Sequence, residues 1–271
     1  MIGANVKGNV HAGVLQHEID SVVSQLNALL SASISLFYSP CSKYPLRYHD
    51  NGSNVNAIQG SVVFHEDTLC SMEMLVKSTK TASAVKSTFR DDKQWKLQQI
   101  QDAINHLKLA TSALNVFPKS SRNGQNQYSK GYIIDVLDKI NRSINMCRMR
   151  LFSPCKLSLE ALVSSGIVKM FTPPLPGDTI VNFFILEDSL VVTHYTVQQS
   201  HTTISKNSQH NNPASLFHPV GAILEHGGTL YEVATAHKAD CPIPWLKKIL
   251  VATDICLQLT NELREKLVHT K

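Results

Sequence analysis

Four stretches of the chain repeat apolar side chains every seven residues, in alternating steps of three and four. They run from about residue 12 to 37, 92 to 117, 131 to 152 and 244 to 268. Such spacing places the apolar side chains on one face of a helix, and that face must be buried against something. The stripes are wider than a two-position zipper seam. We therefore expect the helices to pack on one another as a bundle, with an intermolecular coiled coil as the alternative.

The seams define the side chains that this packing should bury. In chain order they are Leu15, Ile19, Val22, Leu26, Leu29, Ser33 and Leu36; Leu97, Ile100, Ile104, Leu107, Thr111 and Leu114; Ile133, Val136, Ile140, Ile144, Cys147 and Leu151; and Leu246, Ile249, Thr253, Cys256, Thr260, Leu263 and Leu267. Polar residues in the first and last seams weaken a simple dimer zipper.

Local signals set several helix ends. Asp91 has Gln94 three residues on, which is a capping-box arrangement at the start of the second helix. Pro244 suits the first turn of the last helix. A short additional helix is expected over residues 159–164, stopped at Gly166.

The remaining apolar runs are rich in Val, Ile, Phe and Tyr and are separated by short polar turns, which is typical of hairpins. The paired strands expected are 57–64 with 69–76, 179–186 with 190–197, and 220–225 with 229–236. Isolated hairpins are marginal in water, so the six strands need a common sheet.

The predicted fold is α+β and elongated, with an antiparallel four-helix bundle lobe, in which the N- and C-terminal helices come together, and an inserted antiparallel β lobe. The helical domain is assigned to residues 1–50, 90–165 and 241–271, and the β domain to residues 56–78 and 175–240.

Composition bounds the protein class. The 271 residues are 43% hydrophobic and 17% charged, with no run approaching 18 apolar residues, so we expect a soluble intracellular protein without a transmembrane helix. Residues 77–150 carry 14 Lys and Arg against 5 Asp and Glu, whereas the rest of the chain is net negative. A basic segment can meet an acidic partner or can simply be a solvated helix face.

The six cysteines form no CxxC pair and are interpreted as buried or idle thiols.

Known catalytic and phosphate-binding motifs are absent from the sequence. It contains no GxxxxGK[ST], GxGxxG, GxSxG or HExxH segment and no zinc-finger spacing. The twelve histidines are dispersed, and His194 and His237 fall in or beside expected strands as structural or surface imidazoles. We therefore expect no enzyme activity, no cofactor or metal, and no nucleic-acid partner.

Three short stretches stand out as packing or recognition segments, centred on Trp95, on the proline-rich KMFTPPLP and on CPIPW. Trp95 either plugs the junction between the lobes or faces a partner, since Trp and Arg are favoured interface anchors. Trp245 is expected in the core at the elbow into the last helix. The candidate partner-binding or inter-lobe residues are Arg90, Asp91, Asp92, Lys93, Trp95, Lys96, Gln98, Gln99, Met170, Phe171, Pro174, Pro176, Pro242, Pro244 and Trp245.

The same stretches carry a family resemblance. RDDKQWKLQQIQDA at 90–103, GIVKMFTPPLPGDTIVN at 166–182 and HKADCPIPWLKKIL at 237–250 closely resemble the Rogdi family, and matches extend in order from about residue 14 to 263. The loop at 198–213 and both termini look unlike those of vertebrate members.

This resemblance implies a helical domain plus a β domain and no catalytic activity. It also implies a subunit of a RAVE-type complex that promotes V-ATPase assembly and organelle or synaptic-vesicle acidification. The implied partners are rabconnectin-type WD-repeat proteins and V-ATPase subunits. The implied location is the cytoplasm, on vesicle or endosomal membranes through those partners, presynaptic in neurons, with a nuclear pool open. The alternatives are a self-associating coiled-coil regulator and an enzyme with an unfamiliar site in the β lobe.

Overall fold

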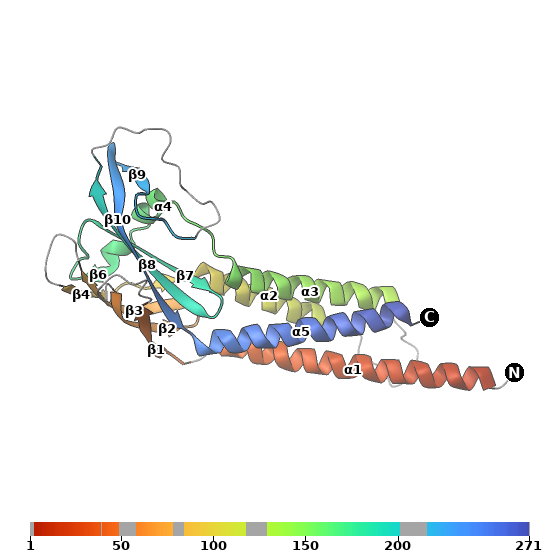
Figure 1. Ribbon diagram of the computed structural model, residues 1–271. Coiled ribbons are helices and arrows are strands. Elements are labelled where there is room, and N and C mark those ends of the chain that lie inside the picture. The colour runs from red at the N-terminus through yellow and green to blue at the C-terminus, as the bar shows by residue number, and fades with distance from the viewer. Residues whose placement is uncertain are drawn as a thin grey trace. The chain divides into compact units, whose positions relative to one another are not determined.

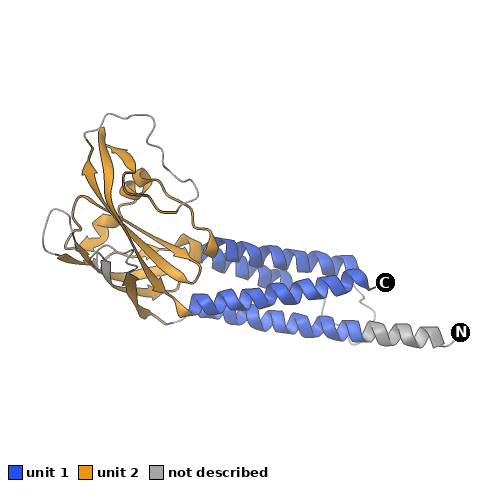
Figure 2. Cartoon of the chain, viewed as in Figure 1, with its two compact units in different colours: residues 1–38, 101–150, 245–271 blue, residues 39–100, 151–244 orange. Residues whose placement is uncertain are grey.

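The computed structural model describes residues 3–38, 40–48, 58–77, 84–117, 129–200 and 216–270. Within them the chain forms helices and one extended antiparallel sheet (Figure 1). It divides into two compact units (Figure 2). The helical unit combines residues 1–38, 101–150 and 245–271, and the sheet unit combines residues 39–100 and 151–244.

The helical unit contains the four long helices that the heptad pattern predicts. They are α1 (Gly3–Phe37), α2 (Gln98–Asn115), α3 (Lys130–Phe152) and α5 (Pro244–His269). The first three residues of α2, the last two of α3 and the first of α5 count with the sheet unit. Pro244 is the first residue of α5, as predicted, where a missing N–H costs nothing.

Burial follows the predicted seams closely. All seven seam residues of α5 and all six of α3 are buried, including the polar Thr253 and Thr260. In α1 the buried side drifts across the expected seam, so that Leu30 and Phe37 are buried in place of Leu29 and Leu36. An ideal helix turns every 3.6 residues, and a strict seven-residue repeat therefore drifts around it.

One segment of α1 is long and apolar enough to cross a membrane by length and composition alone. It spans Val14–Phe37, with a mean hydropathy of 1.2 in its most apolar window. The sequence analysis expected no segment of this length and hydropathy, and that expectation is wrong for α1. Core helices of soluble proteins pass the same test when they are mostly buried, whereas 22% of this window is buried. The buried residues of α1 include Ile19, Leu26 and Leu30.

The sheet unit is built on a ten-stranded sheet with the order β6-β4-β3-β2-β1-β10-β8-β7, to which β5 adds on β3 and β9 on β10. The strand bounds are β1 Ser42–Tyr48, β2 Ile58–His65, β3 Thr68–Lys77, β4 Ala84–Phe89, β5 Trp95–Lys96, β6 Phe171–Thr172, β7 Thr179–Leu186, β8 Ser189–Gln199, β9 Ile223–His226 and β10 Thr229–Pro242. The three predicted hairpins are confirmed as β2–β3, β7–β8 and β9–β10.

The predicted architecture is wrong, although the α+β class is right. A four-helix bundle with an inserted β lobe of six strands was expected, whereas the structure has one large curled antiparallel sheet of ten strands. The difference comes from four strands that were not expected, namely β1, β4, β5 and β6. Of these, β1 pairs with β2 on one side and with β10 on the other, and so joins the β2–β3 hairpin to the rest of the sheet. This sheet, rather than a bundle, is the principal architecture.

A short helix, α4 (Leu159–Ser164), and a 3₁₀ turn, η1 (Ile167–Met170), complete the sheet unit. The Ser158 hydroxyl caps α4 by accepting the Ala161 N–H, and Gly166 adopts the left-handed conformation that stops it, as predicted. Leu159 and Leu162 pack with Ile180 and Tyr195 in the core on this side of the sheet.

The predicted capping box at Asp91 is wrong. Residues 91–92 form a turn, Trp95 and Lys96 pair with Leu69 and Thr68 as strand β5, and α2 begins only at Gln98. Pairing with β3 therefore overrides the local helix-start signal.

Candidate partner-binding site

The turn from Arg90 to Lys93 exposes a compact group of opposite charges. Its backbone is fixed because the Arg90 N–H donates to the Met170 carbonyl at 2.8 Å and the Lys93 N–H to the Arg90 carbonyl at 2.9 Å. Asp92 accepts from Arg90 Nε at 3.0 Å and lies 3.2 Å from Lys93 Nζ. Hydrogen bonding from Lys93, together with Arg90, lowers the pKa of Asp92. These exposed pairs contribute little to stability but present ordered charge to a partner.

Lys96 extends this charged surface and is held by Asp67. Its Nζ lies 3.1 Å from Asp67 Oδ2, whose side chain is only 11% exposed. Asp67 also accepts from the Thr68 hydroxyl at 2.9 Å, and its carbonyl accepts the Leu97 N–H at 2.8 Å. The strand-to-helix connection is thereby anchored to the β2–β3 turn.

Trp95 belongs to an aromatic cluster that joins the two ends of the curled sheet. Its ring meets Phe183 of β7 edge-on at 6.3 Å, and Phe183 meets Phe89 of β4 at 6.0 Å. Phe89 in turn packs on Phe171 of β6 at 5.0 Å. Strands β6 and β7 are opposite ends of the strand order, so these edge-to-face contacts close the sheet on itself. Trp95 is half-buried and has a structural role within the sheet unit.

The side-chain amide of Gln99 adds to this closure by pairing with the backbone of β7, as a neighbouring strand would. Its Nε2 donates to the Ile185 carbonyl at 3.0 Å, and its Oε1 accepts the Ile185 N–H at 2.8 Å. Ile185 lies on β7, the last strand of the order, so the amide satisfies backbone groups of an edge strand. The neighbouring Gln98 is exposed.

Gln99 and Gln94 form a matched pair for a stability test. We expect Gln99→Ala to lower the free energy of unfolding of the sheet unit by about 1–3 kcal/mol, because both Ile185 backbone groups lose their partner. Gln94→Ala, at an exposed glutamine of the same connection, should change it by less than about 0.5 kcal/mol. Urea unfolding of the two variants measures the difference, and equal midpoints would contradict the role given to Gln99.

The candidates of the two proline-rich segments lie in the sheet unit, except Trp245, which lies in the helical unit. Met170 and Phe171 are buried, Pro174 is exposed and Pro176 is half-buried, and the Thr172–Pro173 bond is cis. Pro242, exposed at the end of β10, pairs with Ser189. In the helical unit, Trp245 is buried, as predicted, and packs edge-on against Phe37 at 5.4 Å. The structure thus brings together the candidates from Arg90 to Gln99 with Met170 and Phe171.

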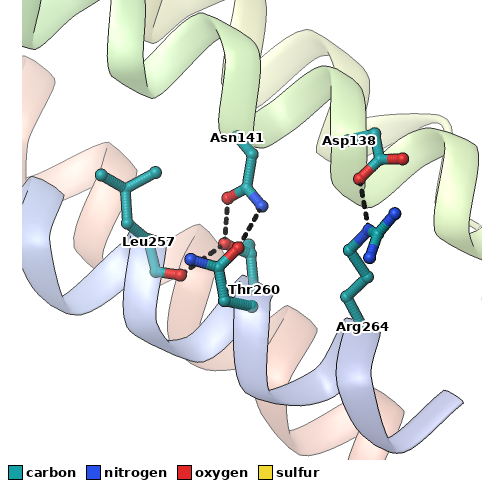
Figure 3. Close-up of polar contacts among 6 residues, drawn as sticks. Asp138, Asn141, Leu257, Thr260 and Arg264 are labelled. Carbon is teal, nitrogen blue, oxygen red and sulfur yellow. Dashed lines mark hydrogen bonds and ion pairs between the residues drawn. The ribbon is translucent and has the colours of Figure 1, made fainter. Parts of the chain in front are cut away.

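Sequence reasoning missed a polar seam between α3 and α5. Figure 3 shows Asn141 and Asp138 of α3 directed toward Thr260 and Arg264 of α5. Asn141 Nδ2 donates to Asn261 Oδ1 at 2.8 Å, and Arg264 Nε to Asp138 Oδ1 at 2.7 Å. The sequence signal for this seam was Thr260, one of two threonines in the apolar stripe of α5. Such a seam sets the register of two helices within one chain.

Arg148 also belongs to the α3–α5 contact. Its Nη1 lies 3.0 Å from the Leu250 carbonyl, 3.1 Å from the Thr253 hydroxyl and 2.9 Å from Asp254 Oδ1. This arginine is therefore part of the packing, whereas Arg142 on the same helix is exposed.

The cysteines are all free thiols. Burial raises the pKa of Cys147 and of Cys241 to about 12 and that of Cys256 to about 11. Thiols of this kind are poor nucleophiles and poor metal ligands at neutral pH. In the described part of the chain, no three His, Cys, Asp or Glu side chains gather as a metal site.

Comparison with known proteins places this arrangement in a family. The model of the family described as "Rogdi leucine zipper containing protein" matches residues 14–229. The chain belongs to the Rogdi family. It is 36% identical over 262 residues to "Protein rogdi homolog" of Danio rerio, covering 94% of this chain and 89% of the relative. Its identity to the Mus musculus homolog is 31%, over 94% and 88% of the two chains, and to "Protein rogdi" of Drosophila melanogaster 24%, over 72% and 73%.

The Rogdi family model covers the charged turn, the aromatic cluster and Gln99, and ends before Trp245. The heptad stripes of α3 and α5 are buried within the chain itself, and α5 lies beyond the residues that the family model matches.

Proposed function

We propose that this Rogdi-family chain is a non-catalytic adaptor subunit of a RAVE-type complex that promotes V-ATPase assembly. The observation that carries the proposal is family membership along nearly the whole chain. In this role the protein binds rabconnectin-type WD-repeat proteins and V-ATPase subunits. It acts in the cytoplasm and reaches vesicle or endosomal membranes, including presynaptic ones, through those partners.

The adaptor role needs ordered surfaces rather than reactive side chains. The turn at Arg90–Lys93 and the neighbouring Lys96 offer such a surface, because their backbone is tied to Met170 and Asp67 while their charges are exposed. Charge of this kind sets association rate and partner choice more than folding stability.

Purification of the tagged full chain from cytosol, followed by mass spectrometry, tests the proposal. WD-repeat proteins recovered together with V-ATPase subunits would support the adaptor role. Recovery of the chain alone, or only with further copies of itself, would contradict it and favour a self-associating regulator.

Charge reversal tests whether exposed basic side chains of residues 77–150 contribute to partner binding. We expect Lys93→Glu with Arg142→Glu to weaken partner recovery several-fold while the melting temperature stays within about 2 °C of wild type, since both side chains are exposed. Arg148 is left unchanged because it packs between α3 and α5. Lys247→Glu with Lys248→Glu, two exposed lysines on α5, is the matched control. Equal recovery of both double variants would eliminate the steering role.

A further inference from the structure

The outer face of α1 is uncharged over much of its length although it is exposed. From Ser21 to Tyr38 the helix has no charged residue, and only 22% of its most apolar window is buried. Helix faces that meet water usually carry charged side chains. Small side chains, by contrast, allow a second helix to approach closely. The exposed residues before Phe37 are Ser21, Ser24, Gln25, Asn27, Ala28, Ser31, Ala32 and Ser35.

Helix α5 lies antiparallel to α1 and extends the same surface (Figure 1). Trp245 packs on Phe37 at one end of the helix pair, and Lys266 forms an ion pair with Glu18 at the other. The contacts with α3 come from another side of α5. The side of α5 that faces water beside α1 is formed by Lys248, Val251, Ile255, Gln258, Glu262 and Glu265, which are all exposed.

Val251 and Ile255 form the apolar centre of this surface, with exposed fractions of 52% and 42%. Ile255 lies about midway between the two ends of α5 that contact α1, and Ala28 lies about midway between the matching positions of α1. The two residues are therefore level with each other, and Val251 is level with Ala32. Exposed apolar side chains that gather beside small ones are typical of protein contact sites.

Charges of opposite sign lie at the two ends of this surface. Lys248 and Glu262 are seven residues before and after Ile255, so all three lie on one row of α5. Lys247 is exposed at the basic end, and Glu265 at the acidic end. The remaining charged residues near this surface are the ion pairs Lys266–Glu18 and Asp254–Arg148 and, at the acidic end, Asp20.

This charge pattern is complementary to itself. Most homodimers are two-fold symmetric, and both copies then use the same surface. A second copy placed antiparallel, with the axis at Ile255, sets Lys248 of one protomer against Glu262 of its partner, and the reverse. A parallel copy would set the two basic ends together and the two acidic ends together, which costs affinity. The charges therefore favour the antiparallel pair.

We propose that this chain forms an antiparallel two-fold dimer through the outer face of α1 and α5. Ile255 meets its own copy at the axis, the small residues of α1 let the two α1 helices approach, and the Lys248–Glu262 contact forms twice. The heptad stripe of α5 is buried within each protomer, so the dimer does not use it. The contact lies outside residues 77–150 and is independent of the V-ATPase role, so variants that lose it should still recover other partners.

Sedimentation velocity of the full chain between about 1 and 300 µM tests the dimer. Small interfaces bind weakly. We therefore expect the mass to rise with concentration from the 30.0 kDa of one copy toward twice that value, with a Kd of about 10–100 µM. A mass of one copy over the whole range would overturn the proposal.

Ile255→Glu tests the centre of the contact. It sets two carboxylates together at the axis and should weaken the dimer at least about ten-fold. Leu109→Glu is the matched control, because Leu109 is 57% exposed on α2, away from this face, and it should dimerise as wild type does. A folded Ile255→Glu variant that dimerises like wild type would refute the proposed surface.

A charge swap tests the antiparallel arrangement. Lys248→Glu alone sets like charges together, as does Glu262→Lys alone, and each should weaken the dimer. The double variant, Lys248→Glu with Glu262→Lys, restores opposite charges and should recover most of the wild-type affinity, which general damage to α5 would not allow. A double variant as weak as the sum of the two single changes would rule out the antiparallel pairing.

Discussion

Replacing Trp245 with alanine is expected to lower the free energy of unfolding of the helical unit by about 3–5 kcal/mol. The indole is only 8% exposed at the first turn of α5, and its ring packs edge-on against Phe37 of α1. Both the apolar area and the aromatic contact are lost in the variant, and a cavity remains. Because whole domains are stable by only about 5–15 kcal/mol, this is a large share of the total.

Trp95→Ala is the matched control, since Trp95 is half-buried. The same truncation there should cost about 2 kcal/mol or less, in proportion to the smaller buried area. Trp245→Ala leaves Trp95 as the single tryptophan, because the chain has two. Its fluorescence then follows the sheet unit during urea unfolding, while the circular dichroism signal at 222 nm follows the helices. An unchanged helical transition would contradict a core role and favour Trp245 as a binding anchor.

The helical unit could be predicted because its information is local and repeated. In α5 each of seven seam positions is buried, and the pattern alone located them. The polar contacts of the same helix could not be predicted, because Thr260 and Asn141 are 119 residues apart. A threonine in an apolar stripe indicates that a partner is needed but does not identify it.

The sheet was only partly predictable. The hairpins have short turns and β-branched strands, whereas β1 reads SKYPLRY, with a proline and three charged or aromatic side chains among its first six residues. Pro45 is tolerated because β1 has only β2 beside it at that point, and pairing with β10 begins at Arg47. The strand that unites the sheet therefore has the weakest local signal.

The candidate site shows the same limit. Arg90, Trp95 and Gln99 were selected as one segment, yet the roles of Trp95 and Gln99 depend on Phe183 and Ile185 of β7. These residues close the curled sheet only because particular strands lie at its two ends, and a local sequence pattern does not show which strands those are.

The second large effect is a loss of folding stability at acidic pH, which we expect from His194. His194 on β8 is fully buried, and in the described part of the chain neither ring nitrogen has a hydrogen-bond partner. Its ring stacks on that of His237, its cross-strand neighbour on β10, with centroids 6.0 Å apart. Burial, reinforced by the nearby His237, lowers the pKa of His194 from 6.5 to about 3.

Because the folded state lowers the pKa of His194, acid should destabilise the protein. The unfolded chain takes up a proton at His194 near pH 6.5, whereas the folded chain resists it down to about pH 3. Stability is therefore fully present above pH 6.5 and falls by about 1.4 kcal/mol per pH unit below it, which is about 2 kcal/mol between pH 6.5 and 5. Burial also lowers the pKa of His237 and of His218, which adds to the loss in the same range.

His194→Leu isolates the contribution of this side chain. Leucine has a similar volume, carries no proton and leaves no unpartnered nitrogen in the core, so the variant should be as stable as wild type or more stable at pH 7. Its stability should then fall by about 2 kcal/mol less than that of wild type between pH 6.5 and 5. Urea unfolding at four pH values measures both slopes.

His237→Leu removes the stacked neighbour but leaves His194 buried, so it should retain most of the wild-type slope. Parallel slopes for wild type and His194→Leu would mean that His194 is already charged, or already reaches water, in the folded protein.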